Sequence, residues 1–234
     1  MRFLIPLNAA ALLASTVLAS RRGGHGGYGS PQPCSTNSQL PCLCPSGTDY
    51  WESSTWAVIG ATAQDVKDLI MDYYKCAWLG VVPYETHGPD NKPGVSIRTS
   101  FLPTKVGVYS ITEKEMARLK QHLSLHIMPW KLVENLDINP RGGFIEKFEQ
   151  LASTVPVPYT SGNGSFSGYW VTLESTYIFQ NETAIRWSIY ACETGHARNF
   201  AVFHENALKN ATTVLAAQGK IKGTNIGPYS YQNF

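Results

Sequence analysis

The chain has 234 residues, with 19 Lys and Arg against 17 Asp and Glu, which gives a formal net charge of +2. This balance provides no electrostatic footprint for nucleic acid or for an anionic membrane surface, so nucleic acid is excluded as an expected partner. Charged residues make up only 15% of the chain and aromatic residues 12%, which suits a domain with extensive apolar interior surface. A cavity lining produces this composition, and so does an ordinary packed core.

The first 19 residues predict a secretory signal peptide. Arg2 precedes an apolar stretch from Phe3 to Leu18, and Val17-Leu18-Ala19 forms a small-residue cleavage pattern. The stretch is too short and too close to the terminus for a membrane span, and no later stretch approaches the required length. The sequence therefore predicts a protein that is secreted or lies in the lumen of the secretory pathway, without an integral membrane segment.

Residues 20–47 are predicted to form a flexible tail, because they are rich in Gly, Pro and Ser and have no apolar periodicity. The chain has five cysteines, at Cys34, Cys42, Cys44, Cys76 and Cys192. In an oxidising compartment disulfides are expected, with the tail joined to the domain through Cys192 or Cys76 and at least one thiol left over. The spacing lacks the pattern of a zinc site, so no metal is predicted.

The predicted domain covers 48–222 and begins with a strand and a helix. Residues 51–61 alternate and are rich in Trp, Thr, Val and Ile, which is typical of a strand. Thr62 and Asp65 resemble a capping box that opens a helix over 62–74, and Gly80 ends this element.

Short strand candidates follow, separated by turn clusters, at 81–86, 95–101, 106–112, 131–138 and 143–157. Residues 113–125 fit a continued strand or a short helix, and periodicity does not decide between them. Two longer strand-like runs, 169–180 and 183–193, lead into an amphipathic helix from about 198 to 218. Gly219 stands where a C-cap glycine belongs, and residues 223–234 are predicted as a C-terminal tail.

This order of strand, helix, antiparallel strands and closing helix resembles the START-like superfamily, which includes polyketide cyclases and Bet v 1-like ligand carriers. The resemblance covers about 51–218 and rests on the segments 55–61, 62–74, 94–98, 143–148, 183–190 and the final helix. It implies an α+β fold in which a curved antiparallel β-sheet wraps around a long C-terminal α-helix and encloses an apolar cavity. It does not imply one chemistry, since members include carriers, sensors and cyclases. The cone-shaped ketosteroid-isomerase-like fold ranks second, because those domains start with helices and end in strands.

Strand alternation assigns residues to the two faces of the long strands. In the first strand the better cavity face holds Tyr169, Val171, Leu173, Ser175, Tyr177 and Phe179, whose phenols can hydrogen-bond an oxygenated ligand. In the second strand Ile185, Trp187 and Ile189 are expected inside and Arg186 outside, although a cavity can reverse that assignment. The predicted ligand-binding residues are Tyr169, Leu173, Tyr177, Phe179, Trp187, Phe200 and Phe203.

Three side chains are candidates for acid–base catalysis. Glu146 alternates with Phe144 and Phe148, so it is either a rim residue, which we favour, or a buried general base with a raised pKa. His126 lies in an apolar context, and His204 lies near the apolar face of the final helix. Histidine titrates near neutrality, but the favoured interpretation of each is a structural residue with satisfied hydrogen bonds.

Motifs for other chemistries are missing from the sequence. It contains no Gly-x-Ser-x-Gly elbow, His-Glu-x-x-His pair, Walker loop or Gly-x-Gly-x-x-Gly turn, so neither a metal nor a nucleotide cofactor is predicted. Sequons for N-glycosylation begin at Asn163, Asn181 and Asn210.

Together these features favour a cofactor-free cyclase or isomerase that acts on an apolar, oxygenated, polyketide-like metabolite of secondary metabolism. A shaped cavity with one base and a few phenols suffices for this chemistry, since orienting a flexible molecule contributes much of the rate. The expected partner is thus an apolar small molecule. A secreted lipid or sterol carrier with the same cavity is the second hypothesis, and a secreted surface-interaction protein is the third.

Overall fold

The computed structural model describes residues 32–35, 41–80, 85–101, 127–137, 142–151, 157–158, 165–194 and 200–233, all within one unit, Pro31–Phe234. The predicted segments 106–112 and 113–125, the signal peptide and His126 lie outside these residues. Among the residues described, no helix is long and apolar enough to cross a membrane.

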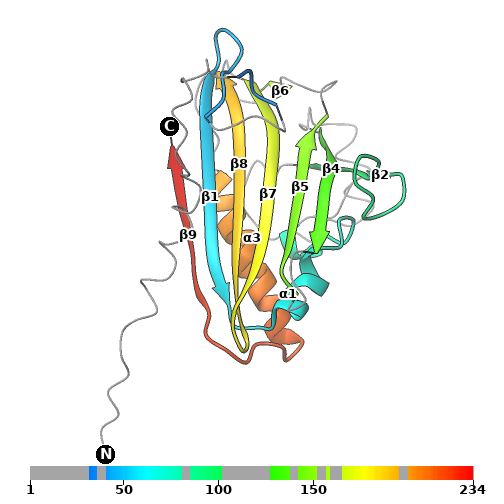
Figure 1. The fold of residues 1–234 in the computed structure, drawn as a ribbon, viewed down its shortest axis with the longest axis vertical. Helices are drawn as coiled ribbons and strands as arrows, with labels where there is room; N and C mark the ends of the chain where they lie inside the picture. Colours follow the sequence, from blue (N-terminus) through cyan, green and yellow to red (C-terminus); the bar gives the residue numbers. More distant parts are fainter. Residues whose placement is uncertain are drawn as a thin grey trace, which may run out of the picture. The chain divides into compact units, whose positions relative to one another are not determined.

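In the described part of the chain, nine strands form one antiparallel sheet (Figure 1). The strands are β1 (Asp49–Ile59), β2 (Glu85–His87), β3 (Ile97–Phe101), β4 (Ile127–Asp137), β5 (Phe144–Gln150), β6 (Val157–Pro158), β7 (Ser165–Phe179), β8 (Glu182–Thr194) and β9 (Ile226–Asn233). Their order in the sheet is β2-β3-β4-β5-β7-β8-β1-β9, and β6 pairs with β7. The α+β fold with a closing C-terminal helix is therefore confirmed.

The predicted capping box begins helix α1 (Ala63–Ile70). The Asp65 backbone N–H donates to Thr62 Oγ1 at 3.1 Å, and the Thr62 hydroxyl donates to Asp65 Oδ2 at 2.6 Å. The helix ends earlier than predicted, because the next backbone N–H groups are taken by a turn: the Tyr73 N–H donates to Asn91 Oδ1 at 2.8 Å. A separate 3₁₀ helix, η2 (Ala77–Leu79), then ends at Gly80, whose left-handed φ of 77° suits glycine.

The final helix, α3 (Phe200–Ala217), lies along one face of the sheet, which we call the inner face (Figure 1). It packs on β1 and β9 and also contacts η2 and α1. Its buried side chains are Phe200, Ala201, His204, Ala207, Leu208, Ala211 and Leu215. Gly219 follows with φ of 69°, as expected for a glycine after a helix C-terminus.

The inner face follows the predicted alternation on both long strands. On β7, Val171, Leu173 and Ser175 are buried. On β8, Ile185, Trp187 and Ile189 are buried and Arg186 is exposed. The predicted orientation of these two strands is therefore correct up to the hairpin that joins them.

Residues 226–233, predicted as part of a C-terminal tail, form strand β9 instead, paired with β1 through contacts such as Trp56↔Tyr229. The preceding loop docks on the end of β1, where the Gly223 N–H donates to Gly60 O at 2.8 Å. A Cβ atom on Gly60 would lie 2.3 Å from the Gly223 carbonyl oxygen, so this close approach requires glycine. The prediction of a tail is wrong, because the chain turns back and completes the sheet edge.

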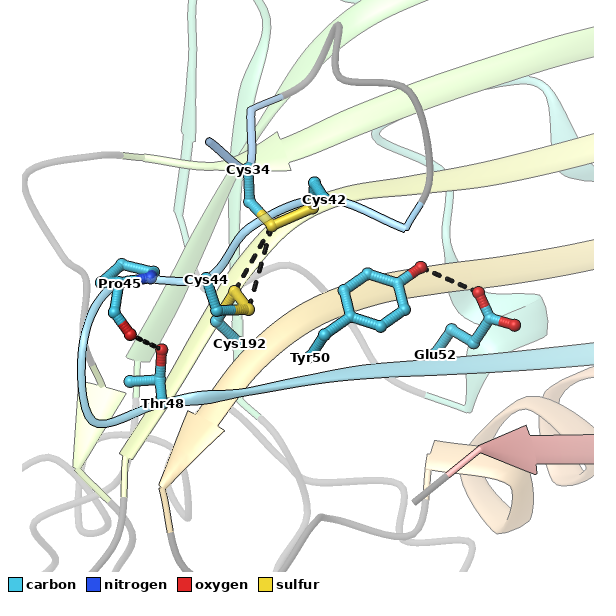
Figure 2. The surroundings of a disulfide bond; sticks show 8 residues. All are labelled: Cys34, Cys42, Cys44, Pro45, Thr48, Tyr50, Glu52 and Cys192. Carbon is cyan, nitrogen blue, oxygen red and sulfur yellow. Dashed lines mark hydrogen bonds between the residues drawn. A yellow bond between two sulfur atoms is a disulfide. The ribbon is translucent and has the colours of Figure 1, made fainter. Parts of the chain in front are cut away.

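Two disulfides hold the N-terminal segment, one within the segment and one to the sheet (Figure 2). Cys34 bonds to Cys42, and Cys44 bonds to Cys192 on β8. The sulfur of Cys34 lies 3.9 Å from that of Cys44 and 3.6 Å from that of Cys192. The expected attachment through Cys192 is confirmed, and Cys76 is a buried thiol outside both disulfides.

Candidate functional site

Glu146 is buried on the inner face, in the middle of β5. The strand alternates strictly, with Phe144, Glu146, Phe148 and Gln150 inside. Its outer positions pair with β4 through ion pairs, Lys131–Glu149 at 2.5 Å and Lys147–Glu134 at 2.6 Å. Because the buried Phe144 and Phe148 fix which face of β5 turns inward, Glu146 between them also points inward and is only 1% exposed. The favoured prediction of a rim residue is wrong, and the alternative of a buried carboxyl holds.

The carboxyl group of Glu146 makes no hydrogen bond to any described residue. Burial raises its pKa from the ordinary 4.5 to about 8, although the nearby Arg98 charge acts to lower it and Asp90 and Asp72 act to raise it further. Glu146 is therefore mostly protonated at pH 7 and ionises within the physiological range.

Arg98 brings a buried cation into the same part of the inner face. It lies on β3 and is 4% exposed. Its Nη1 donates to the Tyr73 carbonyl oxygen at 2.6 Å. The guanidinium carbon lies 4.1 Å from the centre of the Tyr73 ring and 5.0 Å from that of Phe148, close enough for cation–π attraction.

The segment between α1 and η2 supplies two further titratable groups. Burial raises the pKa of the Tyr73 hydroxyl and that of the Cys76 thiol, and both groups feel the charges of Arg98 and Glu146. We call Arg98, Glu146, Tyr73 and Cys76 the charged cluster. Its members come from β3, β5 and the α1–η2 connection, so this cluster forms only once the sheet and the connection are both in place.

His204, the second predicted catalytic residue, lies in a different environment. Its ring stacks on Trp187 with centroids 4.0 Å apart and an interplanar angle of 14°. Phe200 and Phe203 pack at its sides, with centroids 6.2 Å and 5.8 Å away. Burial lowers its pKa to about 3, so the ring is neutral at physiological pH. Its Nδ1 has no hydrogen-bond partner among the described residues, so the favoured interpretation of a histidine with satisfied hydrogen bonds is wrong for this atom.

Strand register separates these two groups on the inner face. Leu173 on β7 pairs with Glu146 on one side and with Trp187 on the other. Glu146 and the Trp187–His204 stack therefore lie two strands apart, on the same cross-strand row. The third candidate, His126, lies outside the described residues.

Some of the predicted ligand-binding residues are buried on or against the inner face, and others lie at the β7–β8 hairpin. Leu173, Trp187 and Phe200 are buried on or against the inner face, and Phe203 is partly buried against the core. Tyr177 lies at the β7–β8 hairpin, where its hydroxyl accepts from the Gln180 N–H at 2.9 Å. Phe179 is 59% exposed, because the register shifts between Tyr177 and Phe179 and ends the alternation. Its placement in a cavity lining was wrong, and the side chain of Tyr169 lies outside the description.

Several buried polar atoms of the inner face were not predicted as site atoms. Those without a hydrogen-bond partner in the described part of the chain include Trp51 Nε1, Ser53 Oγ, Gln150 Nε2, Ser175 Oγ and Trp187 Nε1. Buried polar groups normally have partners, so these atoms mark places where ligand oxygens or water can bind. Strand alternation could have identified these residues, because each lies on the face of its strand that is buried.

The sequons differ in accessibility. Asn210 lies on α3, and its side-chain amide nitrogen donates to the carbonyl oxygens of Ala77 and Trp78 at 3.2 Å and 2.9 Å. Asn181 lies in the β7–β8 turn and is partly exposed, while Asn163 is outside the described residues. The amide that a glycan would occupy is therefore already used at Asn210.

Among the described residues, one group of metal-binding side chains converges, namely Cys34, Cys44 and Cys192. All three sulfurs are held in disulfides, which removes the thiolates that bind metals. Cys44 and Cys192 therefore attach the N-terminal segment to β8, while Cys34 closes a loop within that segment with Cys42.

Comparison with known proteins gives one family match, to the START domain, over residues 50–233. No curated protein matches the sequence. Similar solved structures include a conserved protein from Geobacillus kaustophilus, 12% identical, covering 76% of this chain and 100% of its own, with a TM-score of 0.41. Another is norcoclaurine synthase from Thalictrum flavum in complex with dopamine and hydroxybenzaldehyde, 13% identical, covering 79% of this chain and 100% of its own, with a TM-score of 0.45. Because the family match spans the whole sheet and α3, the chain belongs to the START domain family.

Proposed function

We propose that this START-domain protein is a cofactor-free enzyme that transfers protons on an apolar, oxygenated small molecule, as a cyclase or isomerase does. Family membership supports a protein with a ligand-binding cavity. The observation that carries the enzymatic part is Glu146, a fully buried carboxyl between Phe144 and Phe148 with no hydrogen-bond partner among the described residues. A purely apolar container has no use for such a group, because burying it costs free energy.

The pKa of Glu146 suits this role. A general acid or base is most effective when its pKa lies near the operating pH, and burial brings this carboxyl to about 8. At neutral pH the group is a proton donor, and its ionised fraction is a stronger base than an ordinary carboxylate. One residue can therefore remove a proton from carbon and return it elsewhere on the same molecule.

The other inner-face groups fit an orienting role. The unpartnered indole N–H groups of Trp51 and Trp187 are donors, and the hydroxyl of Ser175 can donate or accept. They are set among buried apolar side chains, a combination typical of small-molecule sites. His204 is unsuited to shuttle protons near neutrality because its pKa is about 3. We assign it to packing against Trp187, and His126 stays a candidate.

A secretory setting is part of the proposal. The N-terminal signal pattern supports it, and so do the two disulfides, which persist in oxidising compartments.

A proton-exchange assay tests the proposal without knowledge of the natural substrate. 2-Tetralone, an apolar enolisable ketone, is incubated in deuterated water with the protein, and loss of its α-hydrogen signals is followed by NMR. The wild type is expected to accelerate the exchange, and Glu146→Gln to lower the protein-dependent rate by about 10²–10⁴-fold. The protein-dependent rate should rise with pH up to about 8, as Glu146 ionises.

Glu149→Gln is the matched control, since it makes the same substitution on the outer face of the same strand. It should leave the exchange rate within about twofold, because surface substitutions rarely perturb a site. Equal exchange rates in the wild type and Glu146→Gln would contradict the acid–base role. Binding of 2-tetralone with no acceleration by the wild type would favour the carrier instead.

A further inference from the structure

Arg98 is a buried cation that contacts no carboxylate of a described residue. Within the described residues it forms no salt bridge, and its one hydrogen bond goes to the uncharged Tyr73 carbonyl. Most N–H donors of the guanidinium therefore make no hydrogen bond to a described residue. Buried charges are normally paired or bound to a ligand, so this arrangement needs an explanation.

The neighbouring carboxyl groups do not supply the missing contact. Glu146 acts on Arg98 through space, but it accepts no hydrogen bond from it. Asp72 and Asp90 act on Glu146 from the same side of the sheet. Asp72 is engaged with Lys75 at 2.6 Å, and Asp90 accepts from the N–H groups of Asn91 and Tyr74 at 2.8 Å and 3.1 Å. Of these three carboxyl groups, only Glu146 is attracted by the guanidinium, and it makes no hydrogen bond to it.

Hydrogen-bond donors that have no partner among the described residues lie close to Glu146, the proposed proton-transfer group. Phe148 is flanked on the inner face of β5 by Glu146 and Gln150, and the guanidinium of Arg98 lies over its ring. The side-chain amide nitrogen of Gln150 is unpartnered, while its oxygen accepts from the Gly168 N–H at 2.9 Å. Two kinds of donor, a guanidinium and an amide, therefore border the ring next to the carboxyl group.

We propose that Arg98 binds an oxyanion that forms on the substrate, so that the substrate class is an enolisable ketone. This rests on the proposed function, in which Glu146 moves the proton. That reaction also requires stabilisation of the negative charge that forms on the ketone oxygen. Arg98 supplies a fixed positive charge for it, in a low-dielectric setting where electrostatic stabilisation is strongest. Gln150 contributes a second donor on the same side.

The proton and the electrons balance in the following way. The Glu146 carboxylate takes a proton from the carbon next to the ketone, so the C–H bond breaks and an O–H bond forms on Glu146. The electron pair moves onto the ketone oxygen, which becomes an enolate beside Arg98. If a C=C bond is conjugated with the enolate, the enolate regains the proton at the far carbon, which is an isomerisation; otherwise its carbon attacks a second carbonyl, which closes a ring, and the new alkoxide takes the proton. In both cases the proton of Glu146 returns to the product and the carboxylate is restored.

Binding of 2-naphthol tests the role of Arg98 without any turnover. This probe is an aromatic mimic of the enol of 2-tetralone, and its ionised form has a distinct absorption spectrum. Titration of the complex with the wild type should show the naphtholate favoured over the naphthol at least about tenfold relative to water, which is one unit in the pKa of the probe. 2-Methoxynaphthalene, which cannot ionise, serves as the neutral probe.

Three variants separate Arg98 from Glu146. Arg98→Met should abolish the preference for naphtholate and still bind 2-methoxynaphthalene. Arg98→Lys should keep part of the preference, because it retains the charge without the planar fork. Glu146→Gln should keep the full preference while losing proton exchange on 2-tetralone. If Arg98→Met fails to fold, Arg98→Lys and the wild-type preference decide the matter.

The results that overturn this inference differ from those that overturn the proposed function. A wild type that binds 2-naphthol without favouring the naphtholate, or that binds neither naphthalene probe, contradicts the role of Arg98. So does an Arg98→Met variant that keeps the preference. If the naphtholate preference depends on Arg98 but Glu146→Gln exchanges protons as fast as the wild type, then the oxyanion site stands and the acid–base role of Glu146 fails.

Discussion

The inner face of the sheet has two halves that both carry buried side chains but differ in their chemistry. In the helix-covered half, α3 packs on β1, and its His204 stacks on Trp187 of β8 among aromatic rings. In the other half, the charged cluster brings Arg98 and Glu146 together beside the α1–η2 connection. The first half holds His204 and the second holds Glu146, both titratable side chains with atoms that make no hydrogen bond to a described residue.

The difference between the halves shows how burial decides which titratable group can transfer protons near neutral pH. Burial disfavours the charged form of both residues. For His204 this moves the pKa down to about 3, away from neutrality, and for Glu146 it moves the pKa up to about 8, into the working range. The same physical effect therefore inactivates the histidine, the usual residue for proton transfer, and activates the carboxyl group.

The largest expected effect is on stability in the helix-covered half. Trp187→Ala removes a side chain that packs against Trp78, Phe203 and His204 and is 3% exposed. It should lower the free energy of unfolding by about 3–5 kcal/mol, measured by urea unfolding with circular dichroism. Trp56→Ala, at a residue 41% exposed on the outer face, is the control and should cost less than about 1 kcal/mol. Similar losses in the two variants would show that α3 does not depend on this stack.

The second prediction concerns the half with the charged cluster and the loss of stability as pH rises from 4.5 to about 8. Between pH 4.5 and about 8 the folded protein keeps a proton on Glu146 that the unfolded chain has lost. The stabilisation is complete below pH 4.5 and is lost as pH rises towards 8, by about 1.4 kcal/mol per pH unit. Glu146→Gln should remove this dependence, so its advantage over the wild type should grow with pH. A constant difference across this range would mean that Glu146 titrates normally.

The third prediction concerns the helix-covered half and the loss of stability as pH falls. Between pH 6.5 and about 3 the unfolded chain binds a proton on His204 that the folded protein does not. Stability is complete above pH 6.5 and falls with decreasing pH, by up to about 1.4 kcal/mol per pH unit. His204→Gln should reduce this acid sensitivity, whereas His87→Gln, at an exposed position, should not. Thermal unfolding between pH 7 and pH 5 measures the effect, and equal slopes in the wild type and His204→Gln would refute it.

The smallest effect is expected at the sequons. Asn210→Ala removes the two hydrogen bonds that tie α3 to η2 and should cost about 1 kcal/mol of unfolding free energy. Asn181→Ala should leave stability unchanged. Mass spectrometry of protein from a secretory host should find a glycan at Asn181 and none at Asn210. A glycan on Asn210 would show that the amide is free when the chain is modified.

Much of the fold could be predicted, because its signals are local. The alternation of β7 and β8 and the capping box at Thr62 depend only on residues that are close in the sequence. Strand β9 was missed because its main partner, β1, lies more than 160 residues earlier, and only its exposed tyrosines alternate. The early end of α1 was missed for a similar reason, since Asn91 from a distant turn takes the backbone N–H of Tyr73.

The site could be predicted only in part. Alternation correctly placed Glu146 with Phe144 and Phe148, but it could not show how deeply that face is covered. Arg98 was missed because its burial depends on the α1–η2 connection folding over β3, with Tyr73 beneath the guanidinium. Phe179 was misplaced because a register shift at the hairpin leaves no trace in the alternation itself.

The position of β1 has a consequence for biosynthesis. This first strand pairs with β8 on one side and β9 on the other, so both of its neighbours come from the last part of the chain. While the protein is being made, β1 emerges early and has no partner until nearly the whole chain has followed. The sheet can close only after β8 and β9 have been synthesised, and an early strand that waits this long is exposed to wrong pairing. If the chain is exported as proposed, this delay is useful, since it keeps β1 unpaired until β8 and β9 have crossed the translocation channel.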